Sequence, residues 1–383
     1  MGPTIVVDKS TIQSLSRDAV FVLSDFFYTV ITPVLVIEIL ADLKKDKGNR
    51  RKAEQTVSNL ASKVQPIDGF VNVHFESLCV RELLGTPVPM DRRPVVSTRR
   101  ITTDDGTSAA MVDSPEEDAL FRWSCGSFNE TEERLALRWR ASTAAVDLEA
   151  LTANAQPALR SVPRFKSIEE LKEGIDQYMA SAGIQLELLS FFLSQLPAAR
   201  SVPALKAWTL QRWRSGEYEM LKDFAPYVAH CIRVNLVFYL GLLHGLIGTR
   251  RTNRIDMEYF YYTPFGHIFS SGDNLHRDIA PILLDDDQSF IGRDDLVSEL
   301  NSLAAIREAK ADAAENEEPY PPDTSIVRQL TIKHLGAWIP PVGLQMQAGE
   351  DTQEAPEVPE EILKILDAMS QEKDRRPRRR WPT

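Results

Sequence analysis

Short runs of apolar, often β-branched residues precede helix-start signals at both ends of the chain. Residues 4–7 (TIVV) and 28–31 (YTVI) are two such runs, and residues 267–269 (HIF) form a third. Continuous apolar runs of this length are typical of parallel strands that are buried on both faces. The Thr32-Pro33 pair after the second run provides a helix cap and a first helical residue. The pattern therefore predicts an α/β fold with a central, mostly parallel sheet.

The middle of the chain follows a different pattern, in which helical periodicity dominates. Residues 86–107 are rich in proline and arginine and predict loops and short β structure. Helices are expected at residues 115–123, 128–153, 167–181, 183–196, 201–213, 218–247, 274–284 and 294–310. The segment 225–247 is long enough to span a membrane. Because Arg233 and Asn235 interrupt it, we expect a buried core helix and no membrane association.

Beyond residue 310 the composition becomes acidic and rich in proline. The segments AKADAAENEEPYPPD and AGEDTQEAPEVPEE predict flexible linkers on either side of a short docked segment at residues 326–338. We expect residues 311–383 to form a flexible tail with a basic C-terminus. That basic end is either solvated or in contact with nucleic acid or a partner protein.

Composition narrows the class of protein. The 383 residues allow two domains, or one domain with a large insertion. Three well-separated cysteines without a CxxC pair disfavour a disulfide framework or a zinc knuckle, and they fit a reducing, cytoplasmic compartment. The N-terminal residues lack the pattern of a secretory signal. A formal net charge of −11 disfavours nucleic-acid binding over the whole surface, so the placement of the basic residues matters more than their number.

Four carboxylates occupy positions where a catalytic or metal-binding site is expected. Asp8 follows the first predicted strand, and Asp273 closely follows the strand at residues 267–269. Glu38 lies inside the apolar helix after the second strand, and Asp256 opens the aromatic segment MEYFYY. Because parallel strands bring their carboxyl ends to one edge of a sheet, acids placed there are expected to meet. Taken alone, Glu38 fits equally well as an exposed acid on a half-buried helix.

Carboxylates gathered at one edge repel one another unless a cation lies among them. Ligand sets made only of oxygen atoms favour the hard ions Mg²⁺ and Mn²⁺ over zinc. Such an ion polarises a phosphodiester and activates a bound water for in-line attack. The acids therefore predict a site for metal-assisted hydrolysis.

This arrangement resembles the PIN-domain (PIN-like) nucleases. The matching motifs are VVDKS at the first strand, IEILADL in the following helix, and IDMEYFYY with FSSGDNLH around the last two acids. The resemblance implies a three-layer α/β fold and a nuclease, most often a ribonuclease, that uses Mg²⁺ or Mn²⁺. The metal-binding and catalytic residues that it implies are Asp8, Glu38, Asp256 and Asp273. Its auxiliary acids are Asp42 and Asp278.

The chain departs from the family in the spacing of these motifs. Glu38 and Asp256 are 218 positions apart, whereas the family separates them by a few tens of residues. We interpret residues 66–218 as a helical insertion between two halves of a PIN-like domain, residues 1–65 and 219–310. The insertion is expected to cap the site, to recognise a substrate or to bind an inhibitory or regulatory protein partner. Family members also often form homodimers.

Two basic clusters flank the predicted ligands, one after the Glu38 helix and one before Asp256. An otherwise acidic protein needs such basic clusters to bind a phosphate backbone. The first cluster is also typical of a solvated helix end. The predicted nucleic-acid-binding residues are Lys44, Lys45, Arg50, Arg51, Arg251 and Arg254. The aromatic run at 259–262 is more typical of core packing than of base stacking.

Other functions fit less well. A haloacid-dehalogenase-type phosphatase needs a second Asp two residues after the first, and position 10 is Ser. Serine hydrolases need a GxSxG elbow, which this sequence lacks. The alternative that stays open is a non-catalytic PIN-like interaction module that acts through the helical insertion and the tail.

Overall fold

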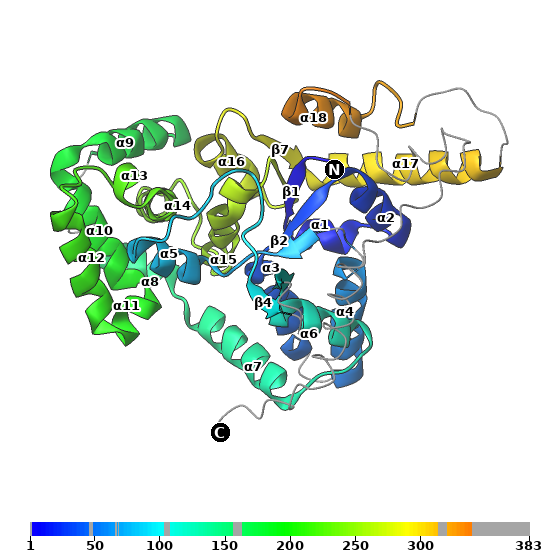
Figure 1. Cartoon of the computed structure of the whole chain (residues 1–383), viewed down its shortest axis with the longest axis horizontal. Coiled ribbons are helices and arrows are strands. Elements are labelled where there is room, and N and C mark those ends of the chain that lie inside the picture. The colour runs from blue at the N-terminus through cyan, green and yellow to red at the C-terminus, as the bar shows by residue number, and fades with distance from the viewer. Residues whose placement is uncertain are drawn as a thin grey trace.

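A five-stranded parallel sheet lies at the centre of the protein (Figure 1). The computed structural model describes residues 2–45, 49–65, 67, 69–102, 108–155, 163–312 and 320–338. The strands of the sheet, in spatial order, are β3 (Gly69–Val71), β2 (Tyr28–Ile31), β1 (Thr4–Val7), β6 (Ile268–Ser271) and β7 (Ser289–Gly292). All four pairings between neighbouring strands are parallel, so the expected α/β fold with a parallel sheet is confirmed.

The order of the strands creates a switch point between β1 and β6. From β1 the chain proceeds to β2 and β3 on one side, and it returns much later to add β6 and β7 on the other. Val7 pairs with Ser270, so the residues that follow the two strands emerge next to each other. In open parallel sheets, the crevice at the carboxyl ends of such strands is the usual binding site. Here it lies between Asp8 and the residues around Ser271.

Helices pack on both faces of this sheet, as a three-layer arrangement requires. Figure 1 shows the sheet between α16 on one side and α1, α2 and α17 on the other. These elements and those near them are α1 (Lys9–Ser14), α2 (Arg17–Phe26), α3 (Pro33–Ala41), the 3₁₀ helix η1 (Asp42–Lys44), α4 (Arg50–Val64), α15 (Asn253–Asp256), the 3₁₀ helix η4 (Met257–Phe265), α16 (Asn274–Leu283), α17 (Arg293–Asp312) and α18 (Ile326–Leu335).

A region of helices and one antiparallel hairpin connects the two halves of the sheet. Its elements are α5 (Phe75–Leu83), β4 (Thr98–Thr102), β5 (Ser108–Val112), α6 (Pro115–Ser124), α7 (Glu130–Ala145), α8 (Leu148–Ala155), α9 (Ile168–Ala180), the 3₁₀ helix η3 (Ala182–Ile184), α10 (Gln185–Gln195), α11 (Pro197–Ser201), α12 (Pro203–Ser215), α13 (Leu221–Phe224) and α14 (Pro226–Leu243). In Figure 1, α9 to α13 lie together at the end of the molecule farthest from α17.

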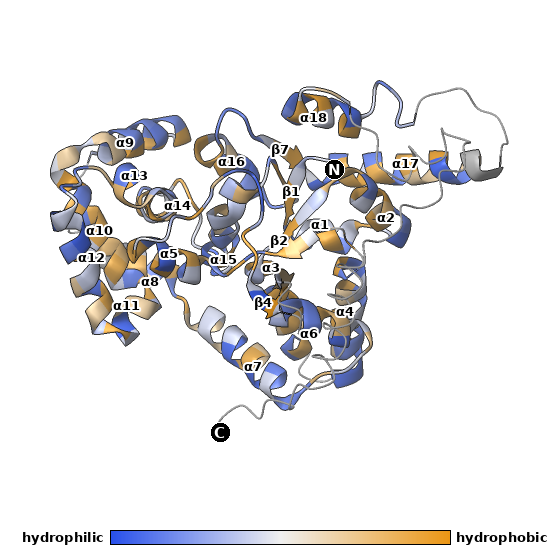
Figure 2. Ribbon diagram, in the orientation of Figure 1, coloured by the Kyte–Doolittle hydropathy of each residue, from blue (hydrophilic) through white to orange (hydrophobic). Residues whose placement is uncertain are grey.

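Local sequence signals explain where several helices begin. Ser16 caps α2 by accepting a hydrogen bond from the backbone N–H of Ala19 at 3.1 Å. Thr32 caps α3 in the same way, and Pro33 supplies the first helical residue. In Figure 2 the central strands are coloured hydrophobic, whereas α4 and α17 alternate hydrophobic and hydrophilic residues. That difference fits strands buried on both faces and helices with one exposed side.

Some predicted elements differ from the structure. The helix expected at 128–153 ends at Ala145, because Val146 is extended and the Asp147 side chain accepts a hydrogen bond from Ala150 to start α8. The helix expected at 218–247 is interrupted at Ala225, just before Pro226 opens α14. Strand β3 was not predicted, and it carries the sheet past the boundary expected at residue 65.

The predicted segments near the C-terminus divide between described and undescribed residues. Residues 320–338 are described, and within them α18 packs on α17 with Val327 fully buried. The docked segment expected at 326–338 is therefore confirmed. The acidic linkers lie largely outside the described residues, and the basic tail lies entirely outside them.

Helix α14 carries the apolar stretch that has the length of a membrane span. Within the described residues, α14 is long and apolar enough to cross a membrane, by length and composition alone. However, 61% of this apolar stretch is buried inside the protein. Tyr227, Cys231 and Val234 are fully buried along it. These contacts are those of a core helix, as expected from the polar residues within the stretch.

Glu82 joins the helical region to α14 through a tertiary helix cap. Its carboxylate is 2% exposed and accepts hydrogen bonds from the backbone N–H groups of Tyr227 at 3.1 Å and Val228 at 2.8 Å. These groups lie in the first turn of α14, where no preceding carbonyl is available to them. Glu82 of α5 therefore satisfies two backbone N–H donors at the start of another helix, α14.

Replacing Glu82 with alanine is expected to lower the free energy of unfolding by about 2–4 kcal/mol, since two buried N–H groups lose their acceptor. Glu82→Gln keeps one acceptor oxygen and should lose less. Denaturant unfolding measures both, with Glu187→Ala on the exposed side of α10 as the control. Equal unfolding midpoints for Glu82→Ala and Glu187→Ala would show that the cap contributes nothing.

Candidate active site

Asp8 lies at the carboxyl end of β1 with its side chain held in place by its neighbours. It caps α1 by accepting a hydrogen bond from the backbone N–H of Thr11 at 2.8 Å. The Ser10 hydroxyl donates to its carboxylate at 2.8–2.9 Å, and the Ser271 hydroxyl donates to Oδ2 at 2.6 Å. Ser271 is the last residue of β6, so the parallel pairing of β1 with β6 delivers this contact.

His276 connects Asp8 to the backbone of Asp256. Its Nε2 lies 2.7 Å from the carbonyl oxygen of Asp256, which can only accept, so Nε2 carries a proton. Its Nδ1 lies 2.7 Å from the Ser271 hydroxyl oxygen. Burial lowers the pKa of His276, which favours a neutral ring whose Nδ1 is an acceptor. Ser271 has a single hydroxyl proton, so Asp8 and His276 share one donor.

Glu38 reaches the same area from the middle of α3. Its Oε2 accepts a hydrogen bond from the Tyr259 hydroxyl at 2.6 Å. Burial raises the pKa of Glu38, while the hydrogen bond from Tyr259 and the charge of Lys9 lower it. Asp8 and Asp42 raise the pKa of Glu38 further through their negative charges. Glu38 is therefore not the exposed acid that its helix alone would allow.

Lys9 supplies a positive charge next to Asp8. Its ammonium group donates to the carbonyl oxygen of Glu38 at 2.9 Å and forms a 2.7 Å ion pair with Asp42. Arg140 of α7 lies 3.4 Å from the other oxygen of Asp42. Asp42, predicted as an auxiliary acid, is thus already paired with two cations. Asp278, the other predicted auxiliary acid, is exposed on α16.

Asp256 and Asp273 face one another across the guanidinium group of Arg250. Nη2 of Arg250 lies 3.6 Å from Asp256 Oδ2, and Nη1 lies 3.5 Å from Asp273 Oδ2. Asp273 caps α16 by accepting a hydrogen bond from the N–H of Leu275 at 2.8 Å. Asp256 is 9% exposed, and its buried Oδ2 accepts no hydrogen bond. A buried carboxylate oxygen without a donor is unfavourable unless a cation lies close to it.

The neighbouring acids affect the pKa of Asp256. Burial raises it most, followed by the negative charges of Asp273, Glu38 and Asp8, and together they raise the pKa to about 8. Arg250 opposes this effect only in part. The four acids predicted from the sequence therefore interact electrostatically at one end of the sheet. Within the described residues, however, no three His, Cys, Asp or Glu side chains are placed as a ready-formed metal site.

The predicted nucleic-acid-binding residues have different environments. Lys44 and Arg50 form ion pairs with Glu133 of α7, and Arg254 is mostly buried against Glu258. The exposed members of the set are Lys45, Arg50, Arg51 and Arg251, and of these Arg50 is already paired with Glu54 and Glu133. The aromatic run at 259–262 is buried, as expected for core packing, and Tyr259 adds the hydrogen bond to Glu38.

Sequence reasoning did not assign a role in the site to Lys9, Ser10, Ser271 or His276. Lys9 and Ser10 are adjacent to Asp8, and Ser271 and His276 lie near Asp273, so proximity to the predicted acids was the available signal. The contact of Ser271 with Asp8 became apparent only through the pairing of β1 with β6, and the partners of Lys9 only through the packing of α3 against α1.

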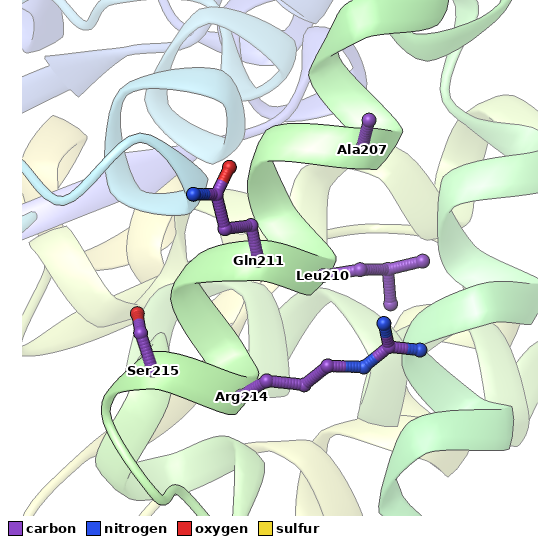
Figure 3. Close-up of a pocket in the computed structure, with 5 residues that line it drawn as sticks. All are labelled: Ala207, Leu210, Gln211, Arg214 and Ser215. Atoms are coloured by element: carbon purple, nitrogen blue, oxygen red, sulfur yellow. The ribbon is translucent and has the colours of Figure 1, made fainter.

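A cavity elsewhere in the structure is separate from these acids. Its volume is about 530 Å³, and its lining residues all belong to α12. Figure 3 shows Leu210 and Arg214 extending toward one side of this helix and Gln211 toward the other. No carboxylate lines the cavity, so it offers none of the chemistry found at the sheet edge.

Comparison with known proteins gave no match: no family model, curated protein or solved structure is similar to this chain.

The raised pKa of Asp256 has a consequence for stability. In the unfolded chain this carboxyl ionises near its ordinary pKa of 3.8, whereas in the folded protein it ionises near 8. The folded state therefore binds more protons between these values, and the free energy of unfolding falls as the pH rises from about 4 to 8.

Asp256→Asn removes this ionisation and should stabilise the metal-free protein at pH 8 by about 2 kcal/mol, or roughly 2–5 °C in melting temperature. Thermal melts in EDTA at pH 4 and pH 8 test the difference, which should vanish at the lower pH. Asp278→Asn, an exposed acid on α16, is the matched control. A variant less stable than the wild type at pH 8 would contradict the electrostatic account.

Proposed function

We propose that this protein is a metal-dependent nuclease, a ribonuclease, with its active site at the carboxyl ends of β1 and β6. The observation that carries the proposal is Asp256, an acid whose pKa is raised to about 8 and whose buried Oδ2 accepts no hydrogen bond. A divalent cation bound directly to this oxygen would remove both penalties, which the guanidinium of Arg250 at 3.6 Å relieves only in part. Strongly perturbed carboxyls are typical of functional sites.

The donor set fits a hard divalent cation. Asp8, Glu38, Asp256 and Asp273 would hold Mg²⁺ or Mn²⁺, because all four offer oxygen ligands. When bound, such an ion polarises a phosphodiester and makes water a nucleophile at neutral pH. The absence of a ready-formed ligand set among the described residues means that these side chains must adjust as the ion binds.

The residues around the acids would orient them. Ser10 and Ser271 fix the carboxylate of Asp8 from two sides. Tyr259 directs one oxygen of Glu38, and its hydroxyl stays protonated because burial and Glu38 raise its pKa. His276 links the Asp8 side of the site to the backbone of Asp256. This network would restrict the side-chain movement that binding of the ion requires.

Substrate binding would fall to the exposed basic residues near the site. Arg250 contacts two of the acids, and Arg251 extends from the same connection to the carbonyl oxygen of Ala144 on α7. Local cations of this kind suit a phosphate backbone on a protein whose net charge is −11.

A non-catalytic interaction module is the second candidate. It is favoured by apolar side chains that the helical region leaves exposed, including Leu137 at 59% and Trp208 at 55%. Exposed apolar residues of this size can mark a protein interface. Under this alternative the acids would bind no metal, or would bind one without cleaving nucleic acid.

The nuclease proposal predicts metal-dependent cleavage that requires Asp273. Single-stranded RNA and DNA are incubated with the full chain in Mg²⁺ or Mn²⁺, with and without EDTA. Asp273→Asn should reduce cleavage by about 100-fold or more, because one anionic ligand is lost. Asparagine remains a good helix cap, so α16 should stay intact.

Asp278→Asn changes the same charge one turn farther along α16 and should retain full activity. Cleavage by Asp273→Asn at the wild-type rate would point to a contaminating nuclease. A folded wild type that binds Mn²⁺ but cleaves neither nucleic acid would favour the interaction module.

A further inference from the structure

Arg250 occupies the space between two of the acids. It lies in the connection between α14 and α15, and its guanidinium contacts Asp256 Oδ2 at 3.6 Å and Asp273 Oδ2 at 3.5 Å. Its two terminal nitrogens each approach a different carboxylate. A single cationic group thus neutralises acids from two segments that meet only in the folded chain.

The contact is electrostatic and does not satisfy the acids as hydrogen-bond acceptors. Both distances exceed the 2.7–3.2 Å typical of an N–H···O hydrogen bond. Asp256 Oδ2 is accordingly buried without a donor. A divalent ion would approach a carboxylate oxygen to about 2.0–2.2 Å and carry twice the charge. The position is therefore better suited to such an ion than to the guanidinium.

Arg250 is also free to leave. Its side chain is 63% exposed, and apart from the two acids its neighbour is the hydroxyl of Thr252, to which Nε donates. By contrast, Arg254 is mostly buried beside Glu258 and stacks near the ring of Phe238. An exposed arginine loses little contact area when it rotates into solvent.

We propose that Arg250 is a resident counter-cation that occupies the Asp256–Asp273 pair in the metal-free protein and moves out when a divalent cation binds there. The displaced guanidinium, still tethered beside the site, becomes a ligand for the substrate phosphate. The inference rests on the metal site of the proposed function but not on cleavage. It explains why a strongly acidic cluster is tolerated before the metal arrives.

The proposal predicts that removing Arg250 strengthens metal binding, because the ion no longer competes with a guanidinium. Calorimetric titration of the full chain with Mg²⁺ at pH 8.5 should give a dissociation constant about tenfold lower for Arg250→Gln than for the wild type. Arg277→Gln is the matched control, since it removes the same charge from the exposed side of α16, the helix that Asp273 caps. Its affinity should stay within about twofold of the wild type.

Thermal melts give a second readout that is independent of activity. In EDTA, Arg250→Gln should melt below the wild type, because two neighbouring acids lose their counter-ion, and added Mg²⁺ should reverse the order. Arg250→Lys keeps the charge but cannot contact both acids at once. Its melting temperature in EDTA should lie between those of Arg250→Gln and the wild type.

The inference is overturned if Arg250→Gln binds Mg²⁺ no more tightly than the wild type, or if Arg277→Gln gives an equal gain. If none of these proteins binds Mg²⁺ at millimolar concentration, the inference is also overturned. Tighter binding by Arg250→Gln without cleavage of RNA or DNA would support the inference while contradicting the nuclease proposal.

Discussion

The parallel pairing of β1 with β6 is the contact on which the rest of the site depends. It joins strands that lie far apart in the sequence and sets Asp8 beside Ser271, 263 positions away. From that pairing follow the hydrogen bond between them, the position of His276 on the next helix and the approach of Asp273. A shift of one residue would point these side chains to the opposite face of the sheet. The buried apolar residues of both strands therefore fix the geometry of the polar ones.

The acids gathered by that pairing are stabilised unequally. Asp8 and Asp273 accept hydrogen bonds from backbone N–H groups at the first turns of α1 and α16, and Glu38 accepts a hydrogen bond from the Tyr259 hydroxyl. Asp256 lacks such a donor at Oδ2 and bears the repulsion of the others. The electrostatic penalty is thus largest at Asp256, and a divalent cation bound there would relieve most of it.

The sequence predicted best the strands that are buried on both faces, because such apolar runs have few alternative structures. Continuous runs such as TIVV and YTVI have to be covered on both faces, so β1, β2 and the first half of β6 were predictable, and with them the acids at strand ends. Strands β3 (GFV) and β7 (SFIG) are short and contain glycine, which makes them indistinguishable from loops by pattern. Ser271 and His276 could not be assigned to the site, because their partners come from strand pairing and not from spacing along the chain.

The helical region acts as part of the support for the site. Arg140 of α7 donates to the carbonyl oxygen of Ala41 at 2.7 Å and approaches Asp42, the partner of Lys9. Arg251 binds the end of the same helix from the connection that carries Arg250. Helix α7 therefore contacts both the end of α3, which carries Glu38, and the segment that leads into Asp256. Since the two contacts are on one helix, α7 links the two halves of the site through residues that lie far from either half in the sequence.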